Sequence, residues 1–177
     1  MKKVMLLTIF AALMMISSAA VAQTTASGTL TVTATVTGSI NLVFNSDASG
    51  VALSSGAGTN AATLAFGNVS AFGAIPAGIV RSTTATTFTV SSAVDVLVTK
   101  TNSASANYTL KAQLGSADAV NTWAVGGVAV TNAAQSTLTA TGAYAANSNF
   151  PVAITVPFTT ASGTLISNTI SYLATAN

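Results

Sequence analysis

Few side chains in this chain could take part in chemistry. There is no histidine and no cysteine, and the only acidic residues are Asp47, Asp95 and Asp118. The commonest general base, the thiol nucleophiles and most transition-metal sites are therefore excluded. A glycosidase needs two carboxyls on opposite sides of one bond, whereas these three lie far apart in the sequence. The sequence predicts no enzymatic activity, no catalytic residue, no metal site and no cofactor.

The remaining polar groups are better explained by structure. Serine and threonine are abundant, but a hydroxyl nucleophile needs an activating base. Beyond the N-terminal segment the only lysines are Lys100 and Lys111, and no motif surrounds either of them. Asp47 follows Asn45 in a weak likeness of a calcium loop, and we interpret it as a turn residue. Asp95 alternates with valines, so we expect it to pair with Lys111 on a neighbouring strand.

The first 22 residues have the features of a secretory signal peptide. Lys2 and Lys3 precede an apolar run that extends to about residue 20, and Ala20-Val21-Ala22 gives the small-x-small pattern before Gln23. The run is short for a membrane anchor, and no basic stop-transfer cluster follows it. We expect cleavage before Gln23, export through the periplasm to the cell surface or beyond, and no membrane span after cleavage.

Charge is scarce in the chain that would remain after cleavage. Its cations are Arg81, Lys100 and Lys111, and they balance the three aspartates. Nucleic-acid binding needs a dense basic face, which three scattered cations cannot form. A net charge near zero leaves little repulsion between copies, so this composition favours association. Because there is no cysteine, packing and strand pairing must supply the stability.

The hydrophobic pattern has a period of two, which is typical of β-strands. In residues 28–37, Leu30, Val32, Ala34 and Val36 alternate with threonines. No segment after residue 22 has a convincing helical period. Further strands are expected at residues 40–44, 51–53, 63–66, 86–90, 94–99, 108–114, 122–130, 136–140, 152–156 and 165–174, with a hairpin turn at Gly126-Gly127. About nine or ten short strands predict an all-β, immunoglobulin-like sandwich.

Aromatic residues lie in or beside most of these strands and are the candidate core. They are Phe44, Phe66, Phe88, Tyr108, Trp123, Phe150, Phe158 and Tyr172. Trp123 has an alternative interpretation as a surface residue that stacks on a sugar ligand.

The leading segment after cleavage, residues 23–37, has two structural alternatives. It is charge-free and alternating, so it can form the first strand of its own domain. It can also leave that domain and complete the sheet of a neighbour, since an unpaired sheet edge accepts an added strand.

Several segments together resemble the chaperone–usher pilins. Residues 29–36 with the following Gly-Ser-Ile-Asn-Leu resemble a donor strand and the first domain strand of that family. The likeness is closest to the cysteine-free colonisation-factor fimbriae, and looser to spore-coat-U-like secreted proteins. It extends to Leu64-Ala-Phe-Gly67, Phe88-Thr-Val90, Tyr108-Thr-Leu110 and the stretch Gly163-Thr-Leu-Ile-Ser-Asn-Thr-Ile-Ser-Tyr172, and so covers most of the chain after residue 22.

The resemblance implies a particular architecture and function. Residues 1–22 would be the signal peptide, 23–37 the donor extension, and 38–177 a sandwich that lacks its last strand. Leu30, Val32, Ala34 and Val36 would fill the groove of another copy or of a related pilin subunit, after a periplasmic chaperone and an outer-membrane usher had handled the chain. The implied product is a structural subunit of an extracellular fibre or surface matrix, with a role in adhesion or biofilm. The alternative is a monomeric secreted binding module or adhesin with a self-complete sandwich.

Overall fold

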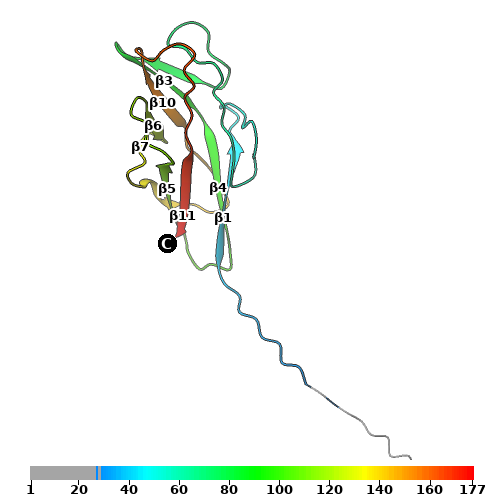
Figure 1. Cartoon of the computed structure of the whole chain (residues 1–177). Coiled ribbons are helices and arrows are strands. Elements are labelled where there is room, and N and C mark those ends of the chain that lie inside the picture. The colour runs from blue at the N-terminus through cyan, green and yellow to red at the C-terminus, as the bar shows by residue number, and fades with distance from the viewer. Residues whose placement is uncertain (1–26, 28) are drawn as a thin grey trace, which may run out of the picture. The chain divides into compact units, whose positions relative to one another are not determined.

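The computed structural model describes residues 27 and 29–177 of the 177-residue chain (Figure 1). The predicted signal peptide, residues 23–26 of the extension, and Gly28 lie outside the described residues. The chain divides into two units, Met1–Thr35 and Val36–Asn177. In the first unit, the described residues form neither helix nor strand and are exposed to solvent.

The second unit is built from strands. The described residues contain no helix, and hence none long and apolar enough to cross a membrane. Eleven strands are found in the described part of the chain, which confirms the all-β, sandwich-like fold: β1 (Ser39–Ser46), β2 (Val80–Thr83), β3 (Thr87–Ser92), β4 (Val94–Thr101), β5 (Tyr108–Leu114), β6 (Thr122–Val125), β7 (Val128–Val130), β8 (Ser136–Gly142), β9 (Asn147–Asn149), β10 (Val152–Pro157) and β11 (Ile170–Ala176).

These strands form three antiparallel sheets with the orders β1-β4-β9, β2-β3-β10-β6-β7 and β11-β5-β8. Strand β3 continues into β4 after the single residue Ala93, and β9 continues into β10 after Phe150 and Pro151. The chain therefore passes from one sheet to another along two nearly continuous strands. At one end of the second unit β1 begins and β11 ends, as Figure 1 shows.

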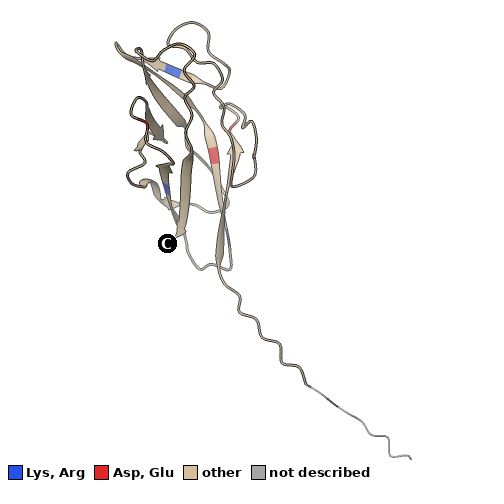
Figure 2. Ribbon diagram, in the orientation of Figure 1, with Lys and Arg blue, Asp and Glu red and all other residues tan. Residues whose placement is uncertain are grey.

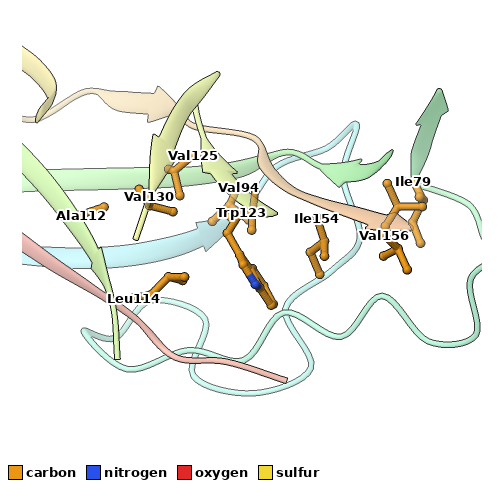
Figure 3. Packing of buried hydrophobic residues seen from close by; sticks show 11 residues of the cluster. Ile79, Val94, Ala112, Leu114, Trp123, Val125, Val130, Ile154 and Val156 are labelled. Atoms are coloured by element: carbon orange, nitrogen blue, oxygen red, sulfur yellow. The ribbon is translucent and has the colours of Figure 1, made fainter. Parts of the chain in front are cut away.

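Alternating residues of the central strands make the core. Val94, Val96 and Val98 of β4 are buried, as are Tyr108 and Leu110 of β5. Side chains at every second position of a strand share one face, so each strand contributes a row of apolar groups to the interior. Figure 3 shows how residues from β4, β5, β6, β7 and β10 meet in the larger of two core clusters.

The hairpin predicted at Gly126-Gly127 is confirmed. Strands β6 and β7 pair antiparallel, with Trp123 opposite Val130. The two glycines that join them have φ angles of 57° and 79°. A two-residue turn with positive φ at both positions matches the twist of a hairpin, and glycine adopts that conformation without strain.

Two short strands, β2 and β9, were not predicted, and some predicted strands are absent. Residues 29–37 and 51–53 carry no strand, and of residues 63–66 only Thr63 makes a bridge, with Ser55. At the C-terminal end, residues 165–169 also carry no strand, because β11 begins at Ile170. A strand needs a partner edge as well as an alternating sequence, and these segments find no such edge among the described residues.

The expected pair of Asp95 with Lys111 is wrong. Asp95 lies on β4, opposite Asn45 and Asn149 of the neighbouring strands. Lys111 lies on β5 of a different sheet, opposite Leu173. Figure 2 shows the few charged residues of the second unit on different strands and loops. Asp47 and Asp95 come together, since Asn149 Nδ2 donates to a carboxylate oxygen of each, at 2.8 and 3.4 Å.

Candidate functional site

The open edge of β1 is the first component of the candidate site. On one side β1 pairs with β4 along its whole length. On the other side, Phe44 accepts a hydrogen bond from Gly58 N–H (2.7 Å) and donates its own N–H to Thr59 (2.9 Å). Because backbone groups of alternate residues point to the same edge, those of Ile40 and Leu42 face this side too. No other described strand pairs with β1 at this edge.

The open edge of β11 is the second component. Strand β11 pairs only with β5 among the described strands. The odd-numbered residues that flank β11, Thr169 and Asn177, direct their backbone groups toward β5. Asn177 N–H donates to the carbonyl oxygen of Asn107 (3.1 Å), and the carbonyl oxygen of Thr169 accepts from Gly115 N–H (2.7 Å). By the same alternation, the backbone groups of Ile170, Tyr172 and Ala174 point to the unpaired edge.

These two edges approach each other at one end of a large groove that is lined by apolar residues and by uncharged polar residues. The Phe44 and Tyr172 rings meet edge to face with centroids 5.0 Å apart. Some Cα atoms of β1 and β11 come within 8 Å of each other. Two strands that flank a third stand about 9.6 Å apart, so an intervening strand would have to part these two at their close approach by at least about 1.6 Å.

Beyond the two rings the groove is wide, with a volume of about 1210 Å³. Val90 of β3, Trp123 of β6 and Ile154 of β10 are among the residues of its floor. Its walls are two segments without strand structure, residues 62–71 and 160–169, which line it almost continuously. None of the described residues that line the groove is charged. The site can therefore hold an extended apolar chain segment.

The rim of the groove leaves large apolar side chains in water. Leu165, on one wall, is 88% exposed, and Phe158 is 38% exposed. Phe72 extends this surface, with its ring centroid 5.9 Å from that of Phe158. Exposed apolar surface continuous with a groove is a common mark of an interaction site.

The residues predicted as the donor strand precede β1 in the chain. Leu30, Val32 and Val36 are 88%, 80% and 74% exposed, and Ala34 is exposed as well. None of them is in a strand with any described residue. The structure thus supplies both an apolar groove and an exposed alternating segment, without joining them.

The alternative interpretation of Trp123 as a surface ligand contact needs correction. Its side chain is only 7% exposed and packs in the core near Val94 and Ile154 (Figure 3). Its Nε1–H donates to Asp118 Oδ2 at 2.8 Å, so the one polar atom of the ring already has a partner. Trp123 therefore stabilises the floor of the groove rather than presenting a stacking face.

Asp118 is a structural residue that sequence reasoning missed. Burial would raise the pKa of its carboxyl, but hydrogen bonds from Asn121, Trp123 and Val120 outweigh burial and lower the pKa from 3.8 to about 2. Two of these donors are the backbone N–H groups of Val120 and Asn121, at 3.0 and 2.8 Å. An aspartate two or three residues before such N–H groups is a turn signal, and that signal is visible in the sequence.

The described residues include no group of three or more acidic, histidine or cysteine side chains that could hold a metal ion. The chain matches no known family model, no curated protein and no solved structure.

Proposed function

We propose that this protein is a structural subunit of an extracellular fibre or surface matrix, in which residues 29–37 of one copy fill the groove of the next. The observation that carries the proposal is the coexistence in one chain of an uncharged apolar groove beside two unpaired strand edges and an exposed segment of matching pattern. Strand addition of this kind couples backbone hydrogen bonding to side-chain insertion.

The match between segment and groove supports the proposal. Leu30, Val32, Ala34 and Val36 would face the floor, and the threonines between them would face water. Burying each of the three larger side chains is worth about 1.5–3 kcal/mol. At the narrow end, insertion would part Phe44 from Tyr172 and supply partners for the backbone groups that both edges leave free. The exposed rim residues Leu165 and Phe158 would lose contact with water.

Charge also supports assembly of identical copies. Neither the segment of residues 29–37 nor the groove lining carries a charge. Copies therefore meet without electrostatic repulsion, and assembly should depend little on salt. Export by the signal peptide, and handling by a chaperone and an usher, belong to the same proposal.

The test compares the full chain, expressed with its signal peptide, with a variant that lacks residues 23–36. We expect the full chain to form polymers that are visible by electron microscopy and run as ladders on unboiled gels. The shortened variant should stay monomeric and bind a synthetic peptide of residues 23–37. A matched control peptide with Val32→Asp should not bind. Equal polymerisation of both chains would contradict the proposal, and a full chain that stays monomeric with a protected N-terminal segment would favour the self-complete binding module.

A further inference from the structure

Both walls of the groove have the burial pattern of a strand, although neither of them is one. In residues 61–67 and again in residues 165–175, every second side chain is half-buried and those between are exposed. Leu64, Phe66 and Ile166 belong to the half-buried set and pack against the larger core cluster. Strict alternation of this kind requires an extended backbone, which is the conformation of a strand.

The wall before β11 continues the open edge of that strand. The carbonyl oxygen of Thr169 points to the β5 side, where it accepts from Gly115 N–H. Backbone groups alternate between the two edges, so those of Ile166 and Asn168 point the other way, as those of Ile170 do. Neither Ile166 nor Asn168 has a backbone hydrogen bond to any described residue. In Figure 1 the chain that leads into β11 continues the line of that strand.

The opposite wall has one bonded edge and one free edge. Thr63 N–H donates to the carbonyl oxygen of Ser55 (3.0 Å), and the carbonyl oxygen of Thr63 accepts from Ser54 N–H (2.9 Å). By the same alternation, the backbone groups of Leu64 and Phe66 point to the other edge. No partner for them is found in the part of the chain that the structure describes. Each wall therefore has a row of side chains on the core and a row of free backbone groups.

The open edge of β1 does not extend along the whole groove. Gly58 and Thr59 already bond to the backbone groups of Phe44, so an added strand can pair with β1 only at Ile40 and Leu42. Beyond Phe44 the groove is lined by the two walls, which are then the neighbours of an added strand. A strand has two hydrogen-bonding edges, and one that lies between the walls can use both.

We propose that residues 62–66 and 165–169 are latent strands, which become strands when residues 29–37 of a second copy lie between them. This inference rests on the proposed function and names the acceptor residues of the same site. Residues 29–37 fit this place because they are uncharged, as the groove lining is, and alternate with the same period of two. They supply both walls with the hydrogen-bonded partner that each lacks, and β11 then extends from Ile170 back to Leu165.

The first test is residue-resolved hydrogen exchange by nuclear magnetic resonance. It uses the full chain with Val32→Asp, which the proposed function expects to stay monomeric, and a synthetic peptide of residues 23–37. On binding, the amides of Leu64, Phe66, Ile166 and Asn168 should exchange more slowly by about tenfold or more. The amides of Ala65 and Ser167 face away from the added strand and should change little.

Alternating protection is the signature of a strand that gains a partner on one edge. A bound peptide that leaves the amides of both walls unchanged, or slows odd and even positions equally, overturns the inference while the proposed function stands. A peptide that does not bind, or a Val32→Asp chain that still polymerises, removes the proposed function and this inference with it.

The second test removes one groove-facing donor in the same chain. Ile166→Pro lacks the N–H, whereas its matched control Ile166→Ala keeps the N–H and also loses the isoleucine side chain. By titration calorimetry, the proline variant should bind the peptide about two- to tenfold more weakly than the alanine variant, as expected for one lost hydrogen bond. Trp123 fluorescence checks the folded core, and Leu64→Pro with Leu64→Ala is the equivalent pair on the other wall should the first not fold. Equal affinity within a folded pair overturns the inference.

Discussion

The carboxylate of Asp118 allows a prediction whose size follows from the structure. It accepts hydrogen bonds from two backbone N–H groups, from the Asn121 amide and from Trp123 Nε1, and these lower its pKa from 3.8 to about 2. One pKa unit corresponds to about 1.4 kcal/mol, so the full depression is worth about 2.4 kcal/mol. Because the side chain is partly exposed, solvent screening reduces the contribution to roughly 1–2 kcal/mol.

The sign of the pH dependence follows from the direction of the shift. The folded state has the lower pKa, so the contribution is fully present above pH 3.8 and is lost as the pH falls toward about 2. In Asp118→Asn the carboxylate is gone, and an amide group faces donors that need an acceptor. We expect the variant to be less stable at pH 7 by roughly 1–2 kcal/mol, the contribution of the charge after solvent screening. The difference from the parent should shrink on acidification.

Urea titration followed by fluorescence measures this effect, since Trp123 is the single tryptophan and its indole is buried. The chain without residues 23–36 is used, so that assembly does not contribute. With a denaturant slope of about 1–3 kcal/mol per molar urea, the midpoint should fall by about 1 M. Asp47→Asn is the control: hydrogen bonds, chiefly from Ser49, also lower the pKa of Asp47, but its donors Ser49 and Asn149 are exposed, so this aspartate should matter less. An Asp118→Asn midpoint equal to the parent's at pH 7, or a gap at pH 2.5 as large as the gap at pH 7, would refute the reasoning.

Three further substitutions test the segment, the groove and the core. Val32→Asp should abolish polymers on unboiled gels, because the variant loses about 1.5–3 kcal/mol of side-chain burial and brings an unpaired charge into an uncharged groove. Thr33→Asp, on the opposite face of the segment, should leave the polymers intact. Equal behaviour of the two variants would contradict the assigned facing. Tyr172→Ala should lower the unfolding free energy in urea by about 2–4 kcal/mol, since its ring packs against an aromatic ring of β1, and an unchanged midpoint would argue against that contact. Gly142→Ala places a Cβ atom 2.3 Å from the buried ring of Tyr108 and should cost about 1–3 kcal/mol with a change in near-ultraviolet circular dichroism; a neutral effect would mean that the ring can move aside.

The parts of the fold that were predictable from sequence are those with a local signal. Strand β5 occupies the predicted residues 108–114, because its apolar residues alternate without interruption. Gly126-Gly127 predicted the hairpin, because its turn has positive φ angles that glycine adopts readily. In both cases the residues themselves determine the local conformation, and the rest of the chain only has to accommodate it.

The parts that were not predictable depend on distant partners. Strands β2 and β9 are short and largely polar, and they exist because β3 and β4 offer edges to them. The fold brings Asp118 within hydrogen-bonding distance of Trp123. Trp123, which the sequence suggested as a ligand contact, is therefore fixed in the core. The sequence of a strand reports which face is apolar, but it does not report which edge the strand will meet.

The same difference between an apolar face and an available edge applies to the strand edges and segments that have no partner. Natural sheets usually protect a free edge with charges, prolines or bulges. Strands β1 and β11 have neither charge nor proline, and the same is true of residues 29–37 and of both groove walls. An alternating sequence without such protection is a hazard in a monomer, since it invites uncontrolled pairing. The same sequence is an advantage where pairing between copies is the purpose.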